Sequence, residues 1–215
     1  MNIIIRLVLF TCTTFFALVL FDSPVRQKYF SKSNRTLSQE NPSELTKKLS
    51  AIQWLVLDVD GVLTDGVISY DSEGNEQKRF NIKDGLGIKL LQKAGIQVGI
   101  ITGRVSPMVQ RRADELGINQ LIQGREDKAA ALKELAEQLT ISMESIAYMG
   151  DDLPDYQAIA CSGCVVTVAD GHPDVKQVAD HVTSLPGGLG AVREFCDLLL
   201  KTQGTYEQVT AGFKK

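Results

Sequence analysis

The chain has few of the residues that build a covalently linked or zinc-stapled scaffold. Its 215 residues include four cysteines, two histidines and one tryptophan. So few cysteines do not support a disulfide framework, and a reducing compartment fits them. Cys161 and Cys164 are close in sequence, but they lead into the strand-like residues 164–168 and do not open a helix. We therefore expect buried small side chains here, and neither a redox motif nor a zinc site.

The chain has no low-complexity composition. Over most of its length it also has no excess of basic charge. Hydrophobic residues make up 44% and charged residues 23%, as in an average globular protein. Residues 1–50 carry seven basic and three acidic side chains, whereas residues 51–215 carry sixteen and twenty-three. An acidic body of this kind argues against nucleic acid as a partner.

One long apolar run stands at the N-terminus, where residues 7–21 contain no charged side chain. A bilayer span takes about 20 residues, so three interpretations stay open for residues 1–21. A secretory signal requires a cleavage site with two small residues separated by one position, and residues 20–24 lack this pattern. A membrane anchor would keep the body at the inner, cytoplasmic face, because basic residues follow the run. The third interpretation is an extension without function. Residues 22–42 are polar and predict a flexible linker.

The rest of the chain alternates strand and helix patterns. Apolar runs typical of buried strands occur at residues 52–58, 96–102, 120–122, 146–151, 165–168 and 181–183. Amphipathic stretches at residues 84–94, 106–116, 127–139 and 189–200 lie between or after them. This alternation predicts an α/β fold, a Rossmann-like parallel sheet with helices on both faces. Ligands of such sheets bind beyond the carboxyl ends of the strands.

Residues 67–80 break the alternation. They predict two short strands around residues 72–75, a small β-hairpin inserted after the first strand. The 42 positions from Asp60 to Thr102 hold this hairpin and one helix but no cap domain. We therefore expect a site that is open in a monomer.

Polar residues gather where the predicted strands end. Asp58 and Asp60 close the first strand, and a second acidic cluster, GDDLPD, occupies residues 150–155. Grouped carboxylates are costly unless a cation offsets them, and an all-oxygen set suits Mg²⁺. Thr102 with Gly103 offers a hydroxyl and backbone N–H groups to an anion, and Lys128 adds a positive charge. Metal, nucleophile and anion donors together indicate phosphoryl transfer. The remaining acids near these segments are interpreted as surface or loop residues, namely Asp65, Asp71, Glu73 and Asp84.

The order of these motifs resembles that of the haloacid dehalogenase-like phosphatases. The motifs are DVDGVLTDG at residues 58–66, TGR at 102–104, Lys128, and GDDLPD at 150–155. Within that superfamily, residues 51–203 are similar to the phosphatases of 3-deoxy-D-manno-octulosonate 8-phosphate. That similarity includes FNIKDG at 80–85, VADGHP at 168–173 and GGLGAVRE at 187–194. It places a phosphatase domain at residues 43–203 and leaves residues 1–42 unexplained.

The resemblance implies a role for each site residue. Asp58 would be the nucleophile that forms an aspartyl-phosphate, and Asp60 the acid/base. Mg²⁺ would be held by Asp58, Asp151 and the backbone carbonyl of Asp60, with support from Asp152 and Asp155. The phosphoryl group and the rest of the substrate would be held by Thr102, Gly103, Arg104 and Lys128. The implied reaction is hydrolysis of a phosphorylated sugar acid in lipopolysaccharide sugar biosynthesis.

The resemblance also implies a homotetramer in which hairpins associate and a neighbour's tail closes the cleft. That tail is residues 204–215, where two glycines favour mobility, and a frayed terminus is the competing interpretation. Two functional alternatives stay open. One is a phosphatase for a related substrate such as a sialic-acid-type 9-phosphate, and the other is a non-catalytic phosphosugar-binding protein.

Overall fold

The computed structural model describes residues 42–214, so the predictions for residues 1–21 and, apart from its last residue, for the linker at residues 22–42 lie outside that range. Its centre is a six-stranded sheet with the order β5-β4-β1-β6-β7-β8, in which every neighbouring pair is parallel. The strands are β1 (Trp54–Leu57), β4 (Gln97–Ile101), β5 (Gln120–Ile122), β6 (Ile146–Met149), β7 (Cys164–Thr167) and β8 (His181–Val182). This order is that of the doubly wound Rossmann sheet, which confirms the predicted fold class.

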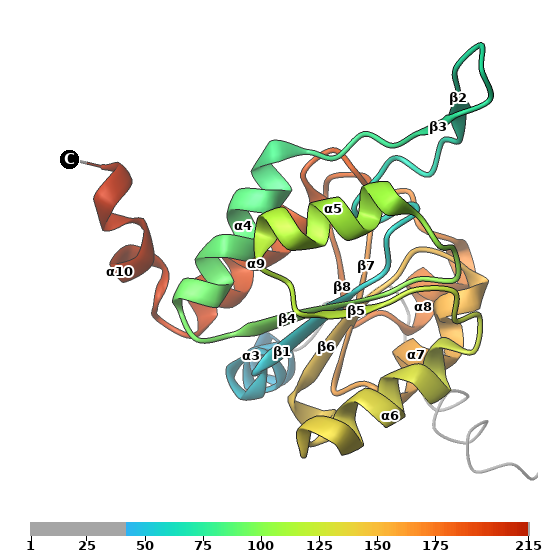
Figure 1. Cartoon of the computed structure of the whole chain (residues 1–215). Helices are drawn as coiled ribbons and strands as arrows, with labels where there is room; N and C mark the ends of the chain where they lie inside the picture. The colour runs from blue at the N-terminus through green and yellow to red at the C-terminus, as the bar shows by residue number, and fades with distance from the viewer. Residues whose placement is uncertain (1–41, 215) are drawn as a thin grey trace, which may run out of the picture. The chain divides into compact units, whose positions relative to one another are not determined.

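Helices cover both faces of this sheet (Figure 1). One face carries α4 (Ile82–Lys93), α5 (Pro107–Leu116) and α9 (Ala191–Thr202). The opposite face carries α6 (Lys128–Leu139), α7 (Tyr156–Cys161) and α8 (Pro173–Val178). Right-handed crossovers place the helices this way, because the chain moves outward from β1 in one direction and then returns to build the other half.

The core is continuous through the central strand. Leu55 and Leu57 join the hydrophobic cluster under α4 and α9, and Val56 between them is just as deeply buried outside that cluster. A strand buried on both faces reads as an unbroken apolar run, which is why residues 52–58 predicted it well. The side chains of Cys164 and Cys196 are buried and that of Cys161 is half-buried, in line with the expected packing role.

The predicted hairpin is present between β1 and α4. It consists of β2 (Ser69–Tyr70) and β3 (Glu76–Gln77), which pair antiparallel and project from the body at the upper right of Figure 1. Val67, Ile68 and Tyr70 are exposed on it. Between β1 and β4 the chain forms this hairpin and α4 and no further domain, as expected.

Asp84 was predicted to be a surface or loop acid, and the structure shows that this is wrong. Its side chain is buried with 1% exposure, in the first turn of α4. It accepts a hydrogen bond of 2.8 Å from the backbone N–H of Arg193, in the first turn of α9. Asp84 therefore ties two helices together, a contact across 109 residues of sequence that local pattern does not reveal.

The helical segments at the two ends of the described residues were not expected. The helix α3 (Pro42–Ala51) packs beside α9, with Leu49 buried and Lys48 paired to Asp180 at 2.7 Å. The C-terminal residues form α10 (Tyr206–Thr210) and a 3₁₀ turn, η3 (Ala211–Phe213). Val209 is buried and its carbonyl accepts from Lys93 Nζ at 3.0 Å. The predicted mobility of residues 204–215 stays a prediction, but residues 206–213 of that range are helical.

No helix within residues 42–214 combines the length and the hydropathy that crossing a bilayer requires.

Candidate active site

Three adjacent strands deliver the polar side chains to one edge of the sheet. β1 lies between β4 and β6, and all three run in the same direction. Asp58 directly follows β1, Thr102 directly follows β4, and Asp151 stands two positions after β6. Carboxyl ends of parallel strands meet at a common edge, so segments far apart in sequence build one site.

These residues line a single pocket of about 730 Å³. Each site residue predicted from the sequence is among its walls: Asp58, Asp60, Thr102, Gly103, Arg104, Lys128, Asp151, Asp152 and Asp155. Gly61, Gly66, Glu126 and Pro154 complete the lining. The structure thus brings all the predicted residues together, while their individual roles remain predictions.

A carboxylate cluster forms the floor of the pocket. Oxygen atoms of Asp58, Asp151 and Asp155 all lie within 4.8 Å of one another. Lys128 Nζ stands 2.9 Å from Asp58 Oδ2 and 2.8 Å from Asp155 Oδ1, with only 5% of its side chain exposed. One ammonium among three carboxylates leaves net negative charge in a poorly solvated place.

This excess of negative charge shifts the pKa values of the residues in the cluster. Burial, reinforced by the negative charge of Asp155, raises the pKa of Asp58 to about 7. Burial and the charges of Asp155 and Asp58 likewise raise the pKa of Asp151 to about 7. Burial alone would lower the pKa of Lys128, but the carboxylates of Asp58 and Asp155 raise it above its usual value. The pocket therefore favours binding of a further cation, because the single ammonium of Lys128 does not balance the charge of the three carboxylates.

Asp155 organises the cluster from below. It is 1% exposed, and Tyr148 donates its phenolic hydrogen to Asp155 Oδ1 at 2.9 Å. Its other oxygen accepts from the backbone N–H of Asp151 at 3.1 Å. Asp152 accepts from the backbone N–H of Leu153 at 2.8 Å in the same capping arrangement, so its side chain fixes the loop. These bonds set the backbone that presents Asp151 to the pocket.

Gly61 must be glycine for steric reasons. It has φ +84°, and a Cβ there would lie 2.0 Å from Asp151 Oδ2. The loop after β1 can approach the acidic loop after β6 because no side chain intervenes.

The donor set fits Mg²⁺. Carboxylate oxygens converge on the pocket, no sulfur or imidazole ligand lies among the lining residues, and the excess negative charge is buried. Hard divalent cations prefer oxygen ligands of this kind. Asp58 and Asp151 are the side chains best placed to hold the ion, because Asp155 is already occupied by Lys128 and Tyr148.

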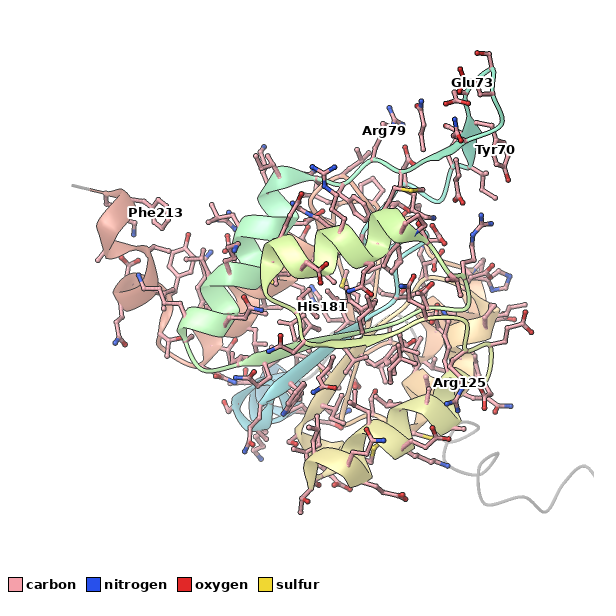
Figure 2. All side chains as sticks on the ribbon, in the orientation of Figure 1. Tyr70, Glu73, Arg79, Arg125, His181 and Phe213 are labelled. Atoms are coloured by element: carbon pink, nitrogen blue, oxygen red, sulfur yellow. The ribbon has the colours of Figure 1, made fainter. Side chains whose placement is uncertain are left out.

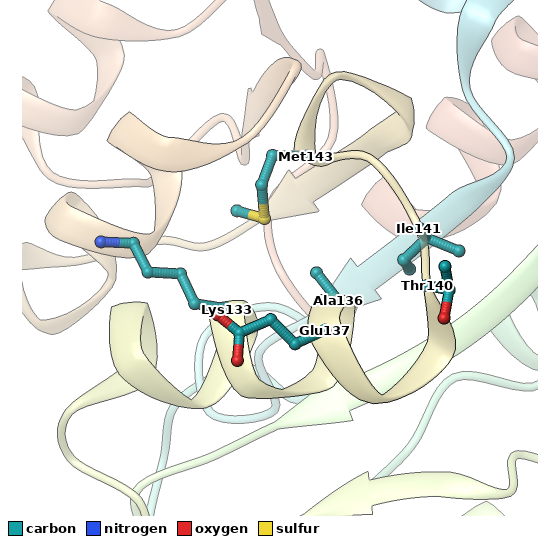
Figure 3. A pocket seen from close by; sticks show the side chains of 6 residues that line it. All are labelled: Lys133, Ala136, Glu137, Thr140, Ile141 and Met143. Carbon is teal, nitrogen blue, oxygen red and sulfur yellow. The ribbon is translucent and has the colours of Figure 1, made fainter.

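A second hollow of about 440 Å³ lies at the opposite end of α6 and is no rival as a cation site (Figure 3). Its lining is Lys133, Ala136, Glu137, Thr140, Ile141 and Met143, with a single carboxylate among them.

Sequence reasoning missed two site residues on the hairpin, Glu76 and Lys78. Lys78 Nζ forms an ion pair with Asp60 Oδ1, and Arg104 Nη2 donates to Glu76 Oε1 at 3.0 Å. Arg104 was expected to be a substrate ligand, and here it is held by Glu76, with Asp60 Oδ2 at 3.8 Å from its Nε. The structure shows alternating exposure over residues 76–80, but the sequence there, EQKRF, carries no signal that would have identified the two residues.

The fold and the site together define a class of protein. The sheet is Rossmann-like, DVD follows its central strand, and a buried lysine and an acidic loop lie on neighbouring segments. This is the arrangement of a haloacid dehalogenase-like hydrolase. A family model described as haloacid dehalogenase-like hydrolase matches residues 120–187.

Comparison with characterised relatives and with crystal structures narrows the class to one family of phosphatases. The 3-deoxy-D-manno-octulosonate 8-phosphate phosphatase of Escherichia coli K12 is 46% identical over 166 residues, which are 77% of this chain and 88% of that protein. The crystal structure of the phosphatase of that name from Moraxella catarrhalis, in complex with magnesium ion, phosphate ion and a KDO molecule, matches with a TM-score of 0.78. It is 46% identical, and the match covers 80% of this chain and 98% of that one. A cobalt-bound form from Haemophilus influenzae gives a TM-score of 0.74 at 44% identity, over 78% of this chain and 99% of that one. The chain belongs to the family of 3-deoxy-D-manno-octulosonate 8-phosphate phosphatases.

Proposed function

We propose that this protein is a Mg²⁺-dependent phosphatase that hydrolyses 3-deoxy-D-manno-octulosonate 8-phosphate to the free sugar acid and phosphate. The observation that carries the proposal is the acidic pocket with its buried lysine, in a chain 46% identical to enzymes of that name over most of their length. A relative in complex with magnesium, phosphate and KDO supports the choice of metal and of substrate class.

The first half of the reaction uses Asp58 and Asp60. A carboxylate oxygen of Asp58 attacks phosphorus, the bond from phosphorus to the sugar oxygen breaks, and Asp60 gives that oxygen a proton. Asp58 then carries the phosphoryl group. Burial of Asp58 at 5% exposure keeps bulk water from solvating the nucleophile, and Lys128 at 2.9 Å helps to keep it ionised.

In the second half, Asp60 accepts a proton from water as the water oxygen bonds to phosphorus. The bond from phosphorus to Asp58 breaks, which releases phosphate and restores the carboxylate. One residue serves as acid and then as base, as the reverse proton movements require.

Positive charge and hydrogen-bond donors hold the phosphoryl oxygens. Lys128 lies beside Asp58, and Thr102 with Gly103 lines the same pocket, so donors surround the place where the phosphoryl group would be carried. When bound, Mg²⁺ supplies the remaining positive charge that offsets these carboxylates and the phosphoryl group. Asp58, Asp151 and the backbone carbonyl of Asp60 would hold it, with Asp152 and Asp155 as support.

The assembly we propose is a homotetramer. The site is open, with no cap domain between β1 and β4, and exposed apolar side chains lie on the hairpin at Val67, Ile68 and Tyr70. Association through these hairpins, with residues 204–215 of a neighbour over the cleft, would exclude water from the reaction. We place the enzyme in the cytoplasm; should residues 1–21 be a membrane anchor, the basic residues that follow the run would keep the body at the inner face.

The test is phosphate release from a panel of sugar phosphates by the full chain, with and without Mg²⁺. The panel contains 3-deoxy-D-manno-octulosonate 8-phosphate, a sialic-acid-type 9-phosphate and hexose phosphates, and we expect the first to give the highest kcat/KM. Asp58→Asn should remove turnover, because an amide cannot take up the phosphoryl group. Preference for the 9-phosphate would establish the alternative substrate. Phosphosugar binding without turnover in the wild type would establish a non-catalytic protein.

A further inference from the structure

Lys78 lies on an exposed hairpin and yet has almost no contact with solvent. Only 4% of its side chain is exposed, compared with 80% for its neighbour Arg79. In extended backbone successive side chains point to opposite sides, so Glu76, Lys78 and Phe80 face the body while Gln77 and Arg79 face outward. Figure 2 shows Arg79 where the hairpin joins the body, and Glu73 and Tyr70 toward the hairpin tip.

The buried ammonium of Lys78 forms ion pairs with two carboxylates. It pairs with Asp60 Oδ1, and it stands 3.4 Å from Glu76 Oε1. Glu76 also accepts from Arg104, whose Nε lies 3.8 Å from Asp60 Oδ2. Asp60 is therefore flanked by two cations, one on each oxygen, and Glu76 contacts both of them.

The hairpin is anchored close to Lys78. Phe80, two residues on, packs against the main hydrophobic cluster, and the guanidinium of Arg112 lies 5.9 Å from the centre of its ring. Asp60 has less support of its own. Its side chain is 30% exposed, and apart from the cations it has a hydroxyl contact of 3.4 Å from Thr64. A carboxylate so placed can rotate unless a neighbour fixes it.

We propose that Lys78 is a positioning residue, which orients the carboxylate of Asp60 for both of its proton transfers. The inference rests on the proposed function, because it takes Asp60 as the acid/base. Lys78 occupies Oδ1 of Asp60, whereas Arg104 Nε stands 3.8 Å from Oδ2, so Oδ2 is the oxygen that would meet the substrate or water. Lys78 is not among the residues that line the pocket, whereas Lys128 is, and this separates the role of Lys78 from that of Lys128. The hairpin thus contributes to the chemistry of its own subunit.

The experiment compares Lys78→Met, Lys78→Arg and Arg79→Met in the full chain, with 3-deoxy-D-manno-octulosonate 8-phosphate and saturating Mg²⁺. For Lys78→Met we expect kcat to fall roughly 10- to 100-fold, the size of loss that small misplacement of a catalytic group causes. KM should stay nearly constant, because no substrate contact is removed. Lys78→Arg should recover part of kcat, and Arg79→Met, whose partner is Asp65 at 2.5 Å, should match the wild type.

A double-mutant cycle with Asp60→Asn separates positioning from a general structural role. Asp60→Asn alone should lower kcat about 10²- to 10⁴-fold. If Lys78 acts through Asp60, adding Lys78→Met to Asp60→Asn should cause almost no further loss. Thermal unfolding of each variant checks the fold, and Lys78→Gln replaces Lys78→Met if the latter does not fold.

Four results would overturn the inference. They are an unchanged kcat in Lys78→Met, a raised KM with normal kcat, a full additional loss in the Asp60→Asn background, and failure of every Lys78 variant to fold. A wild type without phosphatase activity would instead refute the proposed function, and this inference with it. An active wild type with an indifferent Lys78 would refute the inference alone.

Discussion

At the scale of single residues, burial changes what a carboxylate does. Asp58 and Asp151 have pKa values raised to about 7, first by burial and then by their acidic neighbours. Asp71, on the exposed turn of the hairpin, has its pKa lowered by hydrogen bonds from Asn75. The same side chain is thus costly to ionise in the pocket and easy to ionise on the surface. That cost is what a bound cation would relieve.

This cost predicts how stability depends on pH. Without metal, the folded-state pKa values of Asp58 and Asp151 lie above the unfolded value of 3.8, so the folded chain binds more protons. The free energy of unfolding should then fall as pH rises from about 4 to about 7. Mg²⁺ takes over the role of those protons, so it should raise Tm more at about pH 7.5 than at about pH 5. Calorimetry in EDTA and in Mg²⁺ measures this, and equal shifts at both pH values would contradict it.

Asp58→Asn is the matched variant for that experiment. It removes one buried charge, so the metal-free variant should unfold at a higher temperature than the metal-free wild type at neutral pH. Each kcal/mol gained corresponds to about 2–4 °C in a protein of this size. Asp174→Asn, at a side chain that is 60% exposed, is the control and should leave Tm unchanged.

At the scale of elements, the packing of α4 on α9 shows why the segment FNIKDGLG has its sequence. Gly87 faces α9, where a Cβ would lie 3.1 Å from the Cβ of Cys196 and 3.2 Å from the Cα of Arg193. The helices approach closely at that point. Asp84 then reaches the first turn of α9 and accepts a backbone N–H that the helix itself cannot satisfy.

Replacing Asp84 should therefore destabilise the fold without changing the chemistry. Asp84→Ala leaves a buried N–H of α9 unpaired, and losses of this kind amount to about 0.5–2 kcal/mol. Asp84→Asn keeps an acceptor, and it removes a carboxyl group whose pKa burial raises, so it should unfold at or above the wild-type temperature near neutral pH. Thermal unfolding measures both variants. An Asp84→Asn variant as unstable as Asp84→Ala would contradict this account.

At the scale of the whole molecule, the C-terminal residues have two separable parts. Helix α10 packs on α9 and α4 through buried Val209, whereas Phe213 beyond it is 68% exposed. Removing residues 211–215 should leave Tm unchanged but alter kcat/KM for the sugar phosphate, if a neighbour's tail covers the cleft as proposed. Removing residues 204–215 should also lower Tm, since burial of a valine contributes about 1.5–3 kcal/mol.

The oligomeric state can be measured directly as a mass in solution. Light scattering should give the full chain four times its own mass of 23.6 kDa. A monomeric mass, or an unchanged kinetic profile after removal of residues 211–215, would contradict the proposed tetramer or the role of the tail respectively.

Sequence pattern was informative wherever one local property decided the structure. Residues 52–58 and 96–102 are apolar runs that end in polar residues, and they form β1 and β4, because a strand buried on both faces tolerates little else. The residues of the pocket were predicted for a related reason. Parallel strands put their carboxyl ends at one edge, so Asp58, Thr102 and Asp151 had to converge once the strands were recognised.

Tertiary structure alone decided the contacts that link distant segments. Nothing local to Asp84 shows that α9 will present a backbone N–H to it, and nothing local to Lys78 shows that Asp60 will be its partner. The same holds for Asp155, which binds Lys128 across 27 residues and thereby sets the charge balance of the pocket. Hydrophobic periodicity records which side of an element is buried, but the identity of a polar partner depends on how elements cross, and that is fixed only when the chain is packed.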